Sequence, residues 1–93
     1  MLSQLPIDLT KVGRRDIDKE ILRAGMLAEL DAINLYEQMA GIATDNKLRK
    51  MLLDIAKEEK THAGEFQALL LKHDPEQAKE LEHGKEEVEE MTG

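Results

Sequence analysis

The most constraining feature of this 93-residue sequence is a pair of long helical patterns, each apolar on only one narrow face. Apolar residues recur at spacings of three and four over residues 16–41 and again over 45–73. This period is typical of helices that pack side by side in bundles. Gly41 and the segment Thr44-Asp45-Asn46 predict a turn between them. Helices of this length, about 40 Å each, form a hairpin that cannot enclose a core alone.

The segments on either side of this hairpin are shorter and more polar. Residues 1–15 show no clear period and predict an irregular arm. Asp74-Pro75 ends the second helix and favours a third, because Asp is a good N-cap and Pro fits the first helical position. Residues 75–91 are charged and predict a short C-terminal helix. We therefore expect one all-α domain over residues 1–93, with homodimerisation completing a four-helix bundle.

Ionisable residues interrupt both apolar rows near their middles. The row in the first segment reads Leu22, Met26, Glu29, Ile33, Tyr36, Ala40, and that in the second reads Leu48, Leu52, Ile55, Glu59, His62, Phe66, Leu69, His73. An unpaired carboxylate inside a packed seam is costly, and neither row carries a Lys or Arg to compensate it. A bound metal cation would compensate Glu29, Glu59 and His62 together.

The spacing of these three residues fits a di-iron centre. Glu59 and His62 are three residues apart and point to the same side of a helix. A helical di-iron site takes a Glu from each of two helices and a Glu-x-x-His pair from each of two others. One chain supplies half of that set, and a two-fold axis would supply the rest.

The ligand types indicate the metal and the reaction. Mixed carboxylate and imidazole ligands suit iron, manganese or zinc, and calcium or zinc could occupy such a site in vitro. Two iron ions that share carboxylates can pass two electrons to dioxygen. The expected activity is therefore oxidation of Fe(II) to Fe(III).

Other interpretations of the same residues stay open. Glu59 and His62 could form a polar pair that fixes register in a metal-free helical oligomerisation or cargo module. A di-iron peroxidase similar to rubrerythrin is a third alternative, although the absence of cysteine excludes an attached rubredoxin site. Tyr36 is either a core residue or a neighbour of the metals. A second Glu-x-x-His match, Glu80 to His83, lies off any sustained apolar row, and we interpret it as accidental.

Composition excludes several other classes of protein. Acidic residues outnumber basic ones by 20 to 13, which disfavours nucleic-acid binding. No segment approaches the roughly 20 apolar residues that cross a bilayer. Met1 to Leu9 lacks the pattern of a signal peptide. We expect a cytoplasmic protein with neither nucleic-acid nor membrane partners.

Several segments together are similar to a known family. The stretch Ala28-Glu29-Leu30-Asp31-Ala32-Ile33-Asn34-Leu35-Tyr36-Glu37-Gln38 and the motif Glu58-Glu59-Lys60-Thr61-His62 resemble the encapsulated ferritins. The likeness continues through Gly64-Glu65-Phe66, Asp74-Pro75-Glu76-Gln77 and Glu86-Glu87-Val88. It is strongest to the ferritin-like domain fused ahead of the encapsulin shell protein in hyperthermophilic archaea.

The resemblance implies a ferroxidase whose dimers assemble into a ring, typically a decamer, while an encapsulin nanocompartment stores the iron mineral. Carried over by position, the metal ligands are Glu29, Glu59 and His62, with Glu59 as the bridge, and Tyr36 lies near the centre. The chain departs from better-studied members at Ala28, where they have glutamate, and at Leu35, where they have tryptophan. An iron-uptake site of the usual kind is therefore not expected.

Overall fold

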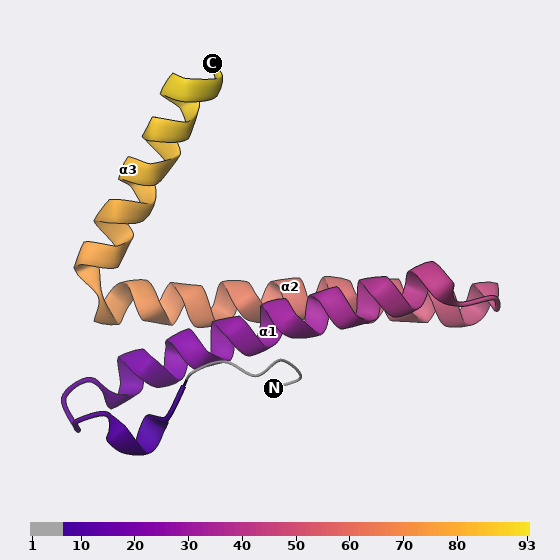
Figure 1. The fold of residues 1–93 in the computed structure, drawn as a ribbon, viewed down its shortest axis with the longest axis horizontal. Helices are drawn as coiled ribbons and strands as arrows, with labels where there is room; N and C mark the ends of the chain where they lie inside the picture. Colours follow the sequence, from indigo (N-terminus) through magenta and orange to yellow (C-terminus); the bar gives the residue numbers. More distant parts are fainter. Residues whose placement is uncertain (1–6) are drawn as a thin grey trace.

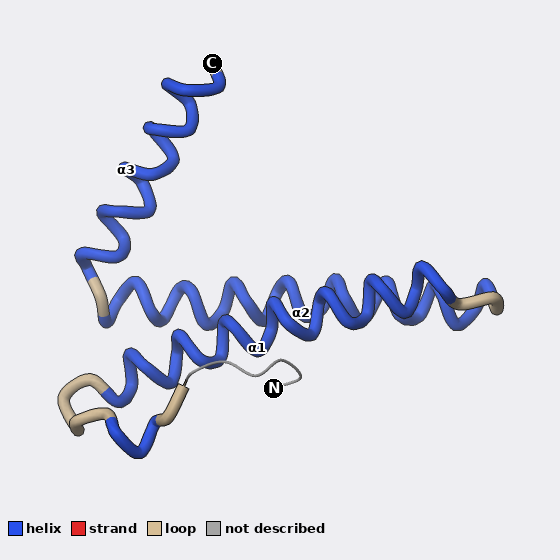
Figure 2. The backbone as a smooth tube through the Cα atoms, viewed as in Figure 1, coloured by secondary structure: helices blue, strands red, loops and turns tan. Residues whose placement is uncertain are grey.

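The computed structural model describes residues 7–93, which contain helices and no strand (Figure 2). A 3₁₀ turn, Leu9–Lys11, precedes three α-helices: α1 (Ile17–Ile42), α2 (Asn46–His73) and α3 (Pro75–Thr92). The all-α fold class predicted from the sequence is confirmed. Of the expected irregular arm, residues 1–6 lie outside the described residues. Residues 9–11 form an ordered turn instead, because Asp8 accepts a hydrogen bond from the Thr10 amide at its start.

Helices α1 and α2 lie side by side as an antiparallel hairpin joined by residues 43–45 (Figure 1). Asp45 caps α2 by accepting a hydrogen bond from the Lys47 amide at 2.9 Å. Arg49 of α2 also stabilises the turn. Its guanidinium donates to the carbonyls of Ala40 and Ala43 and to the side chain of Asn46. These contacts satisfy carbonyls that the end of α1 would otherwise leave unpaired.

The core of the hairpin is a thin apolar seam. Its buried residues are Leu22, Ile33 and Ala40 from α1 and Leu52, Ala56 and Leu70 from α2. Successive residues of the row predicted for α2 lie alternately on two neighbouring faces of the helix. Glu59 and Phe66 are partly buried, whereas Leu48, His62 and Leu69 remain exposed. One half of the row therefore packs in the hairpin, and the other half forms an unpartnered stripe beside it.

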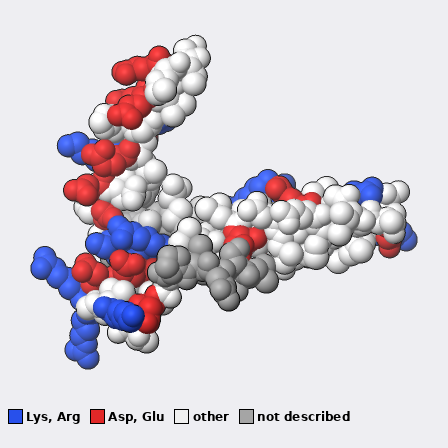
Figure 3. Space-filling model, viewed as in Figure 1, with Lys and Arg blue, Asp and Glu red and all other residues white. Residues whose placement is uncertain are grey.

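Helix α3 leaves the hairpin and projects away from it (Figure 1). Asp74 fixes the joint, since its Oδ2 accepts a hydrogen bond from Arg23 of α1 at 2.9 Å and its Oδ1 caps the Gln77 amide at 3.1 Å. Acidic side chains gather along one edge of α3 (Figure 3). The radius of gyration is 16.4 Å, well above the roughly 12 Å of a compact domain of this length. The chain thus leaves apolar surface uncovered.

Among residues 7–93, no helix combines the length and apolar character that spanning a membrane requires.

Candidate metal centre

The centre begins with Glu29 in the middle of α1. Its side chain is only 18% exposed, because its row faces α2. One carboxylate oxygen, Oε2, is buried and has no hydrogen-bond partner. A buried carboxylate oxygen without a hydrogen-bond donor is costly, and a cation bound at this oxygen would offset the cost.

Helix α2 brings two further donors to the same point. Glu59 and His62 lie one turn apart, and the His62 Nδ1 is 3.3 Å from the Glu59 Oε2. The same nitrogen lies 3.6 Å from the buried Oε2 of Glu29 on α1. One ligand atom from each of the three residues lies within 4.8 Å of the others. The structure therefore brings together all three residues that the sequence predicts as metal ligands.

This donor set fits a metal ion. Two carboxylates and one imidazole provide oxygen and nitrogen ligands of the kind that iron, manganese and zinc accept. The carboxylates are mostly withdrawn from solvent, whereas the imidazole is 46% exposed. A cation held by these three residues would keep one open side toward the exposed stripe of α2.

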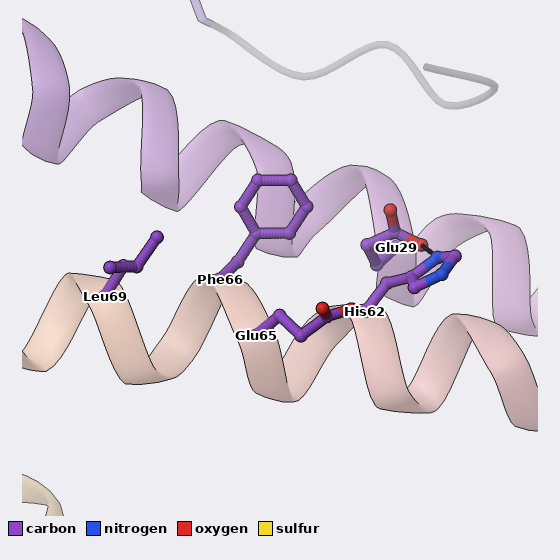
Figure 4. A pocket seen from close by; sticks show the side chains of 5 residues that line it. All are labelled: Glu29, His62, Glu65, Phe66 and Leu69. Carbon is purple, nitrogen blue, oxygen red and sulfur yellow. Dashed lines mark ion pairs between the residues drawn. The ribbon is translucent and has the colours of Figure 1, made fainter.

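An open apolar pocket of about 340 Å³ adjoins the donors. Glu29 and His62 form one end of it, and Glu65, Phe66 and Leu69 line the rest (Figure 4). Sequence reasoning gave Glu65 no role at this centre. Its position, three residues after His62, is the signal that could have placed it on the same side of α2.

Lys60 and Glu37 tie the two helices together close to the centre. Their side chains form an ion pair at 3.1 Å across α1 and α2. The pair neutralises Lys60, which lies between Glu59 and His62 in sequence but points to another face.

Tyr36 lies on the same row of α1 as Glu29, about 10 Å further along the helix axis. Its side chain is partly buried, and its hydroxyl makes no hydrogen bond within residues 7–93. The residue lies outside the group of three donors.

The second Glu-x-x-His pair has the same local geometry in a different environment. The His83 Nδ1 lies 3.2 Å from Glu80, and its Nε2 lies 3.3 Å from Glu87. All three side chains are more than half exposed and belong to α3 alone. The two carboxylates bind opposite nitrogens of the ring and do not converge on one point. Of the described residues, only Glu29, Glu59 and His62 place three ligand atoms close enough together to hold a metal ion.

The helical hairpin and its carboxylate–histidine cluster are typical of ferritin-like proteins. The sequence matches the Rubrerythrin family over residues 20–92. The chain therefore belongs to this ferritin-like family.

Two relatives and one solved structure agree with the resemblance to encapsulated ferritins. A ferritin-like–encapsulin shell fusion protein of Pyrococcus furiosus is 65% identical over 80% of this chain. The encapsulin nanocompartment cargo protein EncC of Myxococcus xanthus is 45% identical over 84% of it. The crystal structure of the encapsulated ferritin domain from Pyrococcus furiosus, 56% identical, matches with a TM-score of 0.85 and covers 100% of this chain and 97% of that one. The resemblance predicted from the sequence is confirmed.

The matched relatives are longer proteins. The chain spans 21% of the Pyrococcus fusion protein and 60% of EncC.

Proposed function

We propose that this chain is a ferroxidase, which binds Fe(II) as its substrate and oxidises it to Fe(III) at a di-iron centre shared by two copies. One observation carries the proposal. The buried Glu29 oxygen has no hydrogen-bond partner, yet it lies beside a carboxylate and an imidazole from the other helix. Two largely desolvated carboxylates and one imidazole need added positive charge, and a divalent cation supplies it.

The three donors take different roles in this proposal. Glu29 and His62 would hold the iron as terminal ligands. Glu59 would be the bridge, because the two oxygens of a carboxylate can bind two metal ions at once. Each of two Fe(II) ions would give up one electron, and dioxygen would accept both electrons with two protons and leave as hydrogen peroxide. Tyr36 is proposed to stand beside the centre as a hydrogen-bond donor or a redox-active group.

A second copy of the chain would complete the centre. One chain provides a single Glu and a single Glu-x-x-His pair, which is half of a helical di-iron set. The open side of the donors and the exposed Leu48 and Leu69 occupy the same stripe of α2. A two-fold axis beside this stripe would cover the apolar residues and bring the second half of the ligands. From the resemblance to encapsulated ferritins we further propose that such dimers assemble into a ring, a decamer.

The proposed place of work is the interior of an encapsulin nanocompartment. One relative is named as a fusion to an encapsulin shell and another as an encapsulin cargo protein. We propose that this chain likewise associates with an encapsulin shell protein and supplies Fe(III) for mineral stored within it.

An anaerobic Fe(II) titration of the purified chain, with particle mass measured in parallel, tests this function. We expect binding to saturate near about one iron per chain, since two iron ions are shared by two copies. Binding should be confined to dimers and larger species, and admitting air should oxidise the iron rapidly. Absence of iron binding, with the oligomer unchanged, would instead favour a metal-free module in which Glu59 and His62 only set register.

A further inference from the structure

Gly25 occupies an unusual place in the interior of α1. Glycine weakens a helix relative to alanine, so a mid-helix glycine calls for a packing reason. A Cβ placed on Gly25 would lie 2.6, 2.8 and 2.9 Å from the Cε1, Cδ1 and Cζ atoms of Phe66. Real Cβ atoms do not approach other atoms so closely. The ring of Phe66 therefore occupies the space that the missing side chain leaves.

The other glycines within the helices differ from Gly25. A Cβ on Gly41, Gly64 or Gly84 would meet no atom within 4 Å. Among the glycines of residues 7–93, only Gly25 has an aromatic ring in the space that a Cβ would occupy.

The contact lies directly beside the metal donors. Gly25 is one turn before Glu29 on α1, and Phe66 is one turn after His62 on α2. Phe66 also lines the pocket that Glu29 and His62 share (Figure 4). A change in the separation of α1 and α2 at this contact would also change the distance between Glu29 and the donors of α2, which lie one turn away.

We propose that the Gly25–Phe66 contact positions the metal centre, by setting the separation of α1 and α2 at which Glu29 reaches Glu59 and His62. This inference rests on the proposed function. Neither residue is a ligand, so both are positioning residues. A methyl group at position 25 leaves two outcomes: the helices move apart, or the Phe66 ring turns into the pocket. Either outcome disturbs the donors.

The contact itself is tested without metal by a double-mutant cycle in thermal unfolding. The variants are Gly25→Ala, Phe66→Leu and the double substitution, with Gly64→Ala as the matched control. Gly64→Ala should unfold at the same temperature as the wild type or higher, because alanine favours helix and the site has room. Gly25→Ala should unfold at a lower temperature, and the double variant should lose less than the sum of the single losses. Additive losses would overturn the close packing.

The positioning role is tested with Co(II) as a probe, bound to each variant in the absence of oxygen. Gly25→Ala should weaken Co(II) binding about tenfold or more, as expected for residues that orient metal ligands, and should alter the visible d–d spectrum. Adding Phe66→Leu should restore most of the affinity and the spectrum. Gly64→Ala should bind Co(II) within about twofold of wild type.

The outcomes separate this inference from the proposed function. If the wild type binds Co(II) and Gly25→Ala binds it equally well, the contact is structural only and the positioning role is wrong. If Gly25→Ala does not fold, Phe66→Leu alone decides, since unchanged affinity and spectrum in that variant would also refute the role. If the wild type binds neither Co(II) nor Fe(II), the proposed function fails and the positioning role falls with it. The double-mutant cycle in thermal unfolding, which needs no metal, still tests the packing of Gly25 against Phe66.

Discussion

Glu29 and Glu59 differ from most acidic residues of the chain in what surrounds them. Their side chains are 18 and 20% exposed, whereas Glu80 and Glu87, which flank the other Glu-x-x-His histidine, are 55 and 62% exposed. Charge that is withdrawn from water is stabilised only by a close partner of opposite sign. One imidazole is shared between the two carboxylates of the seam. We infer that the metal-free centre carries electrostatic strain, which a divalent cation relieves.

Replacing Glu59 by leucine should therefore separate binding from folding. In Glu59→Leu the proposed bridge is lost, so iron binding and oxidation should fall to background. The metal-free protein should stay about as stable as the wild type, because one desolvated carboxylate is removed while His62 keeps Glu29 as its partner. Iron titration and chemical denaturation measure the two effects.

Glu80→Leu is the matched control for that substitution, because it removes the carboxylate of the exposed Glu-x-x-His pair on α3. It should retain full iron binding. Equal losses of iron in both variants would argue that neither pair is a specific site, and retention in both would exclude Glu59 as a ligand.

The helix ends depend on a few local hydrogen bonds. Asp45 and Asp74 cap α2 and α3 through their own side chains. The turn between α1 and α2 depends in addition on Arg49, whose guanidinium serves two backbone carbonyls and one side-chain oxygen. Only a planar group with several donors can satisfy these acceptors together.

Arg49→Ala should consequently weaken the hairpin by about 1–3 kcal/mol, because carbonyls at the end of α1 lose a charged donor. Arg49→Lys should recover only part of this loss, since a single ammonium group cannot reach all three acceptors. Thermal unfolding of the metal-free protein at fixed concentration measures the change. Lys50→Ala is the control, because Lys50 is exposed and makes no ion pair within residues 7–93. If Arg49→Ala loses no more stability than Lys50→Ala, the Arg49 hydrogen bonds do not stabilise the turn.

The molecule as a whole is an open hairpin with one helix projecting from it (Figure 1). Leu48 and Leu69 are 42 and 51% exposed on the stripe of α2 that also carries His62. Covering such an apolar stripe from water is favourable, and a second copy offers the same surface across a two-fold axis. Dimer formation and completion of the iron centre are thus expected to be coupled.

Leu48→Glu tests this coupling at a distance from the ligands. Leu48 lies about 21 Å along α2 from His62, so the substitution leaves the donors untouched. A glutamate in the first turn of a helix is also favourable, so the fold should persist. We expect a shift toward monomer and a parallel loss of tight iron binding, measured by light scattering and titration.

Leu53→Glu provides the comparison. Leu53 is 49% exposed but lies about 140° around α2 from Leu48, away from the stripe. This variant should keep both the dimer and the iron. A monomeric Leu48→Glu protein that still binds iron tightly would show that one chain forms the centre alone.

Much of the fold could be predicted from the sequence because its determinants are local. The helical periods, the turn at residues 43–45 and the Asp74-Pro75 break each depend on residues within a few positions of one another. The i, i+3 spacing of Glu59 and His62 likewise follows from helix geometry alone. The periodic row also placed Glu29 opposite them.

Other features were out of reach of the sequence. Glu80 and His83 have nearly the same separation as Glu59 and His62, so the geometry of the pair alone does not distinguish them, and the prediction depended on the apolar row that carries Glu59 and His62. Glu65 was not predicted to line the pocket, and nothing in the pattern connected Gly25 with Phe66. These relations join residues on different helices or different faces, and they depend on how closely the helices pack.

The sequence by itself determined that this chain is helical, which segments separate its helices to within a residue or so, and which residues could supply metal ligands. Backbone hydrogen bonds, caps and side-chain spacing act over one or two turns, so they depend only on residues that are close together in the sequence. Only the tertiary structure decided how closely Glu29 approaches the Glu59–His62 pair, which half of the α2 row stays exposed, and where α3 points. These outcomes follow from the separation of α1 and α2, which the packing of Phe66 against Gly25 limits, and from the Arg23–Asp74 contact between residues 51 positions apart.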